Sequence, residues 1–111
     1  MVVPYEVRRG DILLIRLNPT VGRVIQMTRP CVVVSPDELN AHLQTLIVAP
    51  MTSGGFAYPF RIPCRFKGKS GYVVLDQIRT IDKDRIIRPL GKLQPATLEM
   101  VIASLQEMFA Q

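Results

Sequence analysis

Thr28–Pro36, with the sequence TRPCVVVSP, is the stretch that decides the fold. Its centre, Cys31–Val34, is an unbroken run of apolar residues, and three of them are β-branched. Because such a run has no polar side, it predicts a strand that is buried on both faces at the centre of a sheet. Arg29-Pro30 stands at the expected entrance of this strand, where proline holds the preceding arginine extended and fixes its guanidinium in place.

The end of the same stretch predicts the start of a short helix. Ser35 is expected to cap it, Pro36 to occupy its first position, and Glu38 to complete a capping box three residues after the serine. The sequence therefore indicates a buried strand with a fixed cation at one end and a capped turn at the other.

The length and the net charge of the chain favour one domain over residues 1–111 that binds a polyanion. A chain of 111 residues forms one hydrophobic core. It contains no run of about 20 apolar residues and no signal peptide, so we expect a cytoplasmic protein. The 14 Lys and Arg exceed the 9 Asp and Glu, and the net charge of +5 favours nucleic acid or an acidic protein as partner.

The possible metal ligands of the chain are few. Cys31 and Cys64 lie in expected strands, where free thiols commonly behave as small buried hydrophobes, so we expect both to be reduced. His42 is the single histidine, and no Cys-x-x-Cys pair accompanies it. We therefore expect no metal site and no cofactor.

The remaining apolar segments complete the expected fold. Strands are predicted at residues 11–17, 45–49, 60–66, 72–75 and 78–81. Pro63 makes the 60–66 strand an edge strand. The helical spacing of apolar residues after Pro95 predicts one long helix, up to Phe109, packed on the sheet. The fold class is α+β with β dominant, a small, strongly bent antiparallel barrel with a C-terminal helix.

The expected connections differ in length and composition. Residues 18–28 form a loop long enough to carry function. Residues 50–55 are expected to form a second loop, in which two glycines after Thr52-Ser53 let the backbone approach a ligand closely. Residues 67–71 read as a turn, and residues 82–85 as a turn or a single helical turn.

Four segments in order make the chain resemble the MazF/PemK family of toxin-antitoxin ribonucleases. They are Arg9-Gly10-Asp11 with Leu17-Asn18-Pro19-Thr20, then Arg29-Pro30 to Ser35-Pro36, then Ala49-Pro50-Met51-Thr52-Ser53-Gly54, and Gly71 with Asp76–Asp82. The resemblance implies an SH3-like barrel of the MazF/CcdB type and a homodimer. It also implies sequence-specific, metal-independent cleavage of single-stranded mRNA, and inhibition by an antitoxin with an acidic, disordered tail.

Carried over position by position, the resemblance implies the site residues. Catalysis is assigned to Arg29 and Thr52. The residues implied to contact RNA are Asn18, Thr20, Arg23, Ser53, Asp76 and Gln77.

Two segments depart from the family pattern. Many members carry Gly-x-Glu-Gln-x-Gly before the Arg-Pro pair, whereas here Gly22 is followed by Arg23–Met27 without the acid, the glutamine at its place or the second glycine. The resemblance implies that base choice lies in this altered loop. Some members also carry an arginine two positions before the aspartate of Asp76, where this chain has Val74.

The residue types suit metal-free RNA cleavage independently of the resemblance. The ribose 2′-hydroxyl is an intramolecular nucleophile, so the protein mainly has to orient the substrate and stabilise the charged phosphorane. Arg29 suits charge stabilisation and is a poor general base, because an arginine side chain stays protonated at neutral pH. Thr52 and Ser53 suit hydrogen bonds to the non-bridging oxygens, and Asp76 is a candidate for the base, which stays open.

Two other functions remain compatible with the expected fold, which by itself does not decide among them. One is a non-enzymatic toxin that inhibits a DNA topoisomerase, and the other is an RNA-binding barrel without cleavage. Retention of Arg29 with Thr52-Ser53 favours the nuclease, because an inhibitor of another protein needs neither.

Overall fold

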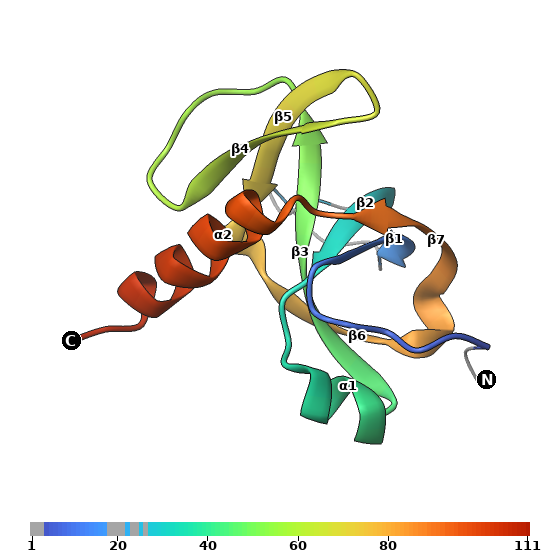
Figure 1. The fold of residues 1–111 in the computed structure, drawn as a ribbon. Helices are drawn as coiled ribbons and strands as arrows, with labels where there is room; N and C mark the ends of the chain where they lie inside the picture. Colours follow the sequence, from blue (N-terminus) through green and yellow to red (C-terminus); the bar gives the residue numbers. More distant parts are fainter. Residues whose placement is uncertain (1–3, 18–21, 23–24, 26) are drawn as a thin grey trace.

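The chain folds into one bent antiparallel sheet with a long helix across it (Figure 1). The structure is a computed structural model that describes residues 4–17, 22, 25 and 27–111. Its elements are β1 (Asp11–Leu17), β2 (Met27–Val33), α1 (Asp37–His42), β3 (Thr45–Ser53), β4 (Arg61–Phe66), β5 (Lys69–Val74), η1 (Leu75–Gln77), β6 (Arg79–Asp82), η2 (Lys83–Arg85), β7 (Ile86–Lys92) and α2 (Pro95–Met108).

The strand order is β4-β5-β3-β2-β1-β7, and β6 pairs with the first half of β3. Every described pairing is antiparallel, and β3 spans the molecule from α1 to the β4–β5 hairpin (Figure 1). These pairings do not close the sheet, but its end strands approach each other, since a Cβ built on Gly91 of β7 would lie 3.6 Å from the Phe66 ring of β4. The β-dominant, barrel-like class with a C-terminal helix is confirmed.

The central strand is buried on both faces, as its composition predicts. Cys31 and Val33 belong to one core cluster, while Val32 and Val34 belong to another. Successive side chains of a strand point to opposite faces, so β2 separates two cores. Leu98 and Val101 of α2 pack into the second core, which confirms that the helix covers the sheet.

The prediction of how the helix after β2 begins is wrong in its details. α1 begins at Asp37, Pro36 stands at the cap position, and no side chain caps the helix. The Ser35 hydroxyl instead donates to Asn40 Oδ1 at 2.6 Å and accepts from the Ile47 amide at 3.1 Å. The serine is buried, so it fastens α1 to β3 rather than capping the helix.

Two expected connections are partly strand. β3 continues through Thr52 and Ser53, which pair with Tyr72 and Gly71 of β5. The turn predicted at 67–71 shrinks to Lys67 and Gly68, both with positive φ, as a two-residue hairpin turn requires. Both differences arise because β3, β4 and β5 pair further than local sequence suggests.

The expectations for β4 and η2 agree with the structure, whereas one strand, β7, was not expected. β4 lies at one end of the sheet, as Pro63 predicts, and η2 is the single helical turn expected after residue 82. β7 was not predicted, because Pro89 and Gly91 interrupt its apolar pattern. Among the described residues, no helix is both long enough and apolar enough to cross a membrane.

Candidate active site

Arg29 lies inside β2 rather than at its entrance. The strand begins at Met27, and Arg29 pairs with Ile15 of β1 while Pro30 follows it. The Arg29 side chain is exposed, and no carboxylate of the described residues lies within ion-pair distance of it. A cation held on a strand without a neutralising partner is suited to bind a phosphate.

Thr52 is the hydroxyl that shares a face of the sheet with Arg29. The β2–β3 ladder ends at Cys31 and Pro50, and Arg29 and Thr52 each lie two residues beyond that pair, so by strand alternation they belong to the same face. Ser53, the next residue of β3, alternates to the other face. The end of these strands is hollowed by a cavity of about 190 Å³, and its lining includes Arg29, Thr52, Ser53, Cys64, Phe66 and Lys69.

Gly71 allows the strands at this cavity to meet. A Cβ built on Gly71 would overlap the backbone carbonyl of Thr52. Glycine is therefore required at this position for the close approach of β5 to β3, and not for its φ angle. The sequence motif contains this glycine, but only the pairing explains it.

Asp76 lies in η1 and is bound by an arginine of β4. Arg61 donates through Nε and Nη2 to the two carboxylate oxygens, both at 3.0 Å. This bidentate hydrogen bond holds the pKa of Asp76 below its ordinary value, against a smaller opposing effect of burial. A general base works best with a pKa near the working pH, so the shift runs against that role for Asp76.

Gln77 and Arg79 hold the end of the long loop after β1. The Gln77 side-chain Oε1 accepts from the Ile25 amide at 2.7 Å, and Arg79 Nη1 donates to the Ile25 carbonyl at 3.4 Å. Ile25 is thus fastened to the segment around β6. The other predicted contacts, Asn18, Thr20 and Arg23, lie outside the described residues.

The comparisons with known proteins decide the family. Residues 8–109 match the model of the family described as PemK-like, MazF-like toxin of type II toxin-antitoxin system. The chain belongs to this family. Its curated relatives are named as endoribonucleases.

The relatives differ in how much of their length is matched. Endoribonuclease PemK of Escherichia coli is 39% identical over 82 residues, which cover 69% of this chain and 62% of that protein. Endoribonuclease MazF9 of Mycobacterium tuberculosis is 34% identical over an alignment of 110 residues, and the match covers 89% of this chain and 92% of that protein.

The solved structures agree with the fold. A crystal structure of MazF from Deinococcus radiodurans superposes with a TM-score of 0.83 at 26% identity, covering 96% of this chain and 99% of that one. A MazE–MazF structure from the same organism has a TM-score of 0.76 at 26% identity, covering 94% and 96%. These relatives do not favour a topoisomerase inhibitor or a non-cleaving RNA-binding barrel.

Arg61 is a member of the site region that sequence reasoning missed in this MazF-like chain. Its ladder partner across the β4–β5 pair is Val74. A cation thus reaches Asp76 from the neighbouring strand. No local sequence pattern predicts this contact, because the register between two strands cannot be read from either strand alone.

The thiols flank the site and are poor nucleophiles. Burial raises the pKa of Cys31 to about 12, although the guanidiniums of Arg79 and Arg29 partly oppose the shift. Burial also raises the pKa of Cys64. Both cysteines are free, so the expectation of reduced thiols is confirmed. Among the described residues, no three His, Cys, Asp or Glu side chains gather as a metal site.

Proposed function

We propose that the chain cleaves single-stranded RNA without a metal ion, by attack of a ribose 2′-hydroxyl on the adjacent phosphorus. The bond from phosphorus to the 5′-oxygen breaks, and the proton that the 2′-hydroxyl loses is balanced by one gained at the 5′-oxygen. The products are a 2′,3′-cyclic phosphate and a 5′-hydroxyl. The observation that carries this proposal is the exposed Arg29 guanidinium, without a carboxylate among the described residues, beside the Thr52 hydroxyl.

Arg29 is assigned to the charge that develops on the phosphorane. Its planar guanidinium can donate two parallel hydrogen bonds to phosphate oxygens, which a lysine cannot. Thr52 is assigned to a non-bridging oxygen, because it shares the face of Arg29. Ser53 lies at the same cavity from the other face and is assigned a secondary contact.

The test is the chemistry of the RNA ends. Purified protein is incubated with a long RNA in excess EDTA, and the fragments are analysed by mass spectrometry. We expect cyclic phosphate and 5′-hydroxyl ends, and no cleavage where deoxyribose replaces the ribose at the cleaved position. Fragments with 5′-phosphates, or equal cleavage of an all-deoxy strand, would show that another mechanism operates.

The proposed assembly in the cytoplasm is a homodimer. Hydrophobic residues make up 48% of the chain, and Met100 and Phe109 on or beside α2 remain exposed in one copy. Obligate interfaces resemble a core, so a second copy is a suitable cover for such side chains. Sedimentation should give twice the chain mass at micromolar concentration, and a monomer would contradict the assembly.

The proposed regulator is an acidic antitoxin. A structure from Deinococcus radiodurans contains MazF with MazE, and a mycobacterial endoribonuclease has been solved in complex with its cognate antitoxin. The net charge of +5 of this chain favours an acidic, disordered tail in its own antitoxin. Titration with an acidic protein encoded beside this chain should suppress cleavage, and added salt should weaken the suppression. Unchanged cleavage at saturating antitoxin would refute it.

A further inference from the structure

A second group of polar and aromatic side chains lies at the sheet edge, outside the assigned catalytic pair. The Arg61 guanidinium stands over the Tyr58 ring, 5.1 Å from its centroid, while it binds Asp76 through two hydrogen bonds. Tyr58 is 59% exposed. Tyr58, Pro59, Arg61 and Asp76 line a hollow of about 260 Å³ that opens to solvent.

The register places this hollow away from the catalytic pair but on the same face of the sheet. Thr52 pairs with Tyr72, and Tyr72 pairs with Pro63, so the row of Arg29 and Thr52 continues to β4. Arg61 lies two residues before Pro63 in β4, so both residues belong to the same face of the sheet. From β4, Cys64 and Phe66 line the cavity of Arg29 and Thr52, whereas Arg61 lines the separate hollow with Tyr58. A base in this hollow therefore belongs to a nucleotide removed from the scissile phosphate.

The charges suit a base better than a phosphate. Asp76 neutralises the Arg61 guanidinium, so the pair offers no net charge to a phosphate, in contrast to Arg29. Arg61 occupies one side of the Tyr58 ring and orients it, and the exposed ring can stack on a base. Stacking of single-stranded bases on aromatic side chains contributes to affinity for every base, because each base has a π-face.

The carboxylate adds a chemical preference. An ionised carboxylate only accepts hydrogen bonds, and its two oxygens have about four acceptor sites, of which Arg61 uses two. The remaining sites can accept from an exocyclic amino group, as carboxylates do from N4 of cytosine. Uracil offers carbonyl oxygens in place of an amino group, and these would face the carboxylate unfavourably.

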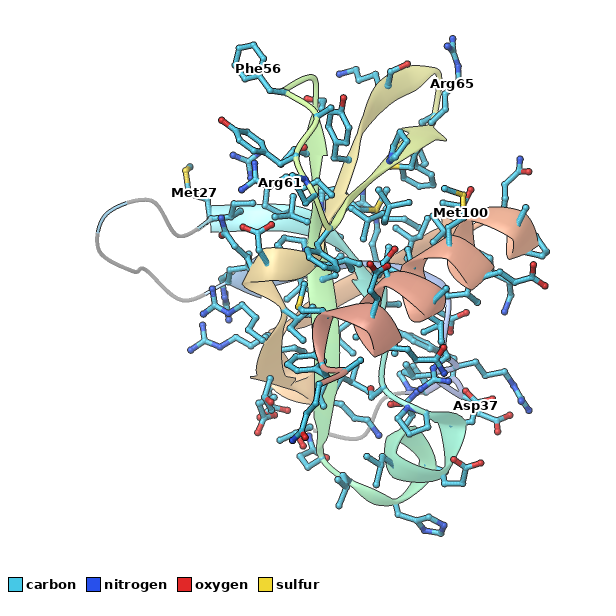
Figure 2. All side chains as sticks on the ribbon, turned by 90° about the vertical axis from the view of Figure 1, so that its left-hand side faces the viewer. Met27, Asp37, Phe56, Arg61, Arg65 and Met100 are labelled. Carbon is cyan, nitrogen blue, oxygen red and sulfur yellow. The ribbon has the colours of Figure 1, made fainter. Side chains whose placement is uncertain are left out.

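We propose that Tyr58, Arg61 and Asp76 form a subsite for one amino-bearing nucleobase of the RNA, outside the nucleotides that flank the cleaved bond. The identity of the ligand as RNA rests on the proposed function. Tyr58 stacks on the base, Asp76 accepts from its amino group, and Arg61 is a positioning residue that orders both. Phe56, 79% exposed, projects from the same loop (Figure 2), but the subsite does not need it.

The experiment measures binding separately from cleavage. Cleavage of a long RNA first gives the preferred sequence, and short RNAs with deoxyribose at the cleaved position then keep that sequence without being cut. A set with one abasic position each is titrated by fluorescence anisotropy. One position outside the scissile pair should weaken binding about 10-fold when its base is removed, as loss of one stacked base does.

The variant cycle assigns that position to the subsite. Tyr58→Ala should weaken binding of the intact RNA to a similar extent, and the abasic change should then have little further effect. Tyr58→Phe keeps the ring and should retain binding. Asp76→Asn, whose amide can also donate, should reduce the preference for cytosine over uracil at this position. Arg88→Ala removes an exposed arginine elsewhere and should change neither measurement.

The outcomes separate the two proposals. For each abasic RNA, removal of the base weakens binding by a measurable factor. If these factors are the same for Tyr58→Ala and for the unaltered protein, the subsite is refuted, even when cleavage proceeds as proposed. If the RNA ends contradict 2′-hydroxyl attack while Tyr58 couples to one base, the mechanism fails and the subsite stands. A preference for uracil that Asp76→Asn leaves unchanged would overturn the role of the carboxylate.

Discussion

Arg29 and Arg61 are arginines on one face of one sheet, yet their surroundings differ. Arg29 is exposed beside Thr52, and no carboxylate of the described residues pairs with it. Arg61 is fixed by Asp76 on one side and by the Tyr58 ring on the other. The comparison indicates that the groups around each guanidinium determine the role of that arginine. A bare guanidinium is suited to a phosphorane, and a neutralised one is suited to position the groups around a base.

The change with the largest expected effect would break both regions at once. Gly71→Ala places a methyl group against the Thr52 carbonyl, so β5 cannot pair with β3 and both arginines lose their common frame. We expect a loss of about 3 kcal/mol or more in the free energy of unfolding, measured by urea denaturation.

Gly68→Ala is the control in the same hairpin. Its Cβ meets open space, and only the positive φ of 77° opposes it. Its expected cost is about 1–2 kcal/mol. Equal losses for the two variants would mean that the close approach to Thr52 does not matter.

The second change separates the two arginines by their effect on turnover. Arg29→Ala should lower the cleavage rate on the order of 100-fold or more with a smaller loss of binding, since one preorganised donor is lost. Arg29→Lys should recover only part of the rate, because lysine lacks the planar fork. Arg61→Ala should mainly weaken binding. Single-turnover cleavage measures the rate, and fluorescence anisotropy with uncleavable RNA measures binding. A larger loss of rate in Arg61→Ala and a larger loss of binding in Arg29→Ala would contradict the assignments.

A smaller effect distinguishes the neighbouring hydroxyls. Thr52→Ala removes a neutral hydrogen bond of about 1 kcal/mol, so cleavage should slow roughly fivefold. Ser53→Ala should have less effect, because its side chain alternates to the other face of β3. Single-turnover rates of the two variants give the comparison, and an equal or larger loss for Ser53→Ala would contradict the face assignment.

The smallest expected effect concerns the stability of the Arg61–Asp76 pair. Arg61 lowers the folded-state pKa of Asp76 below the ordinary 3.8, so the pair stabilises the fold fully above that pH and loses its effect as the pH falls through the folded value. Because both side chains are partly exposed, Arg61→Ala should cost less than about 1 kcal/mol at pH 7.

Urea denaturation at neutral pH and below pH 4 tests this. The difference between Arg61→Ala and the unaltered protein should shrink on acidification, and Arg88→Ala should show no such trend. A cost that persists at low pH would indicate packing on Tyr58 rather than charge as its source.

Local sequence predicted the elements whose residues repeat with a clear period. Cys31–Val34 indicated the doubly buried strand, and the stripe after Pro95 indicated α2. Pro63 indicated the sheet edge. These signals are local, because side-chain periodicity follows from the geometry of one element alone.

Long-range pairing explains what the sequence did not reveal. β7 carries Pro89 and Gly91 and is a strand because β1 pairs with it. Arg61 meets Asp76 only through the register of β4 and β5. Arg29 and Thr52 were predicted as a pair from the resemblance, and their common face follows from pairing. The residues 18–21 that carry two predicted RNA contacts lie outside the described part.

The pairing of β1 with β7 also constrains synthesis of the protein. Asp11 pairs with Lys92, and their side chains are joined by an ion pair of 3.0 Å. During translation, β1 leaves the ribosome long before its outer neighbour exists, so one edge stays open until β7 is made. Such non-local strand pairing slows folding and exposes strand edges. We therefore expect the nascent chain to be more prone to aggregation until β7 has been synthesised.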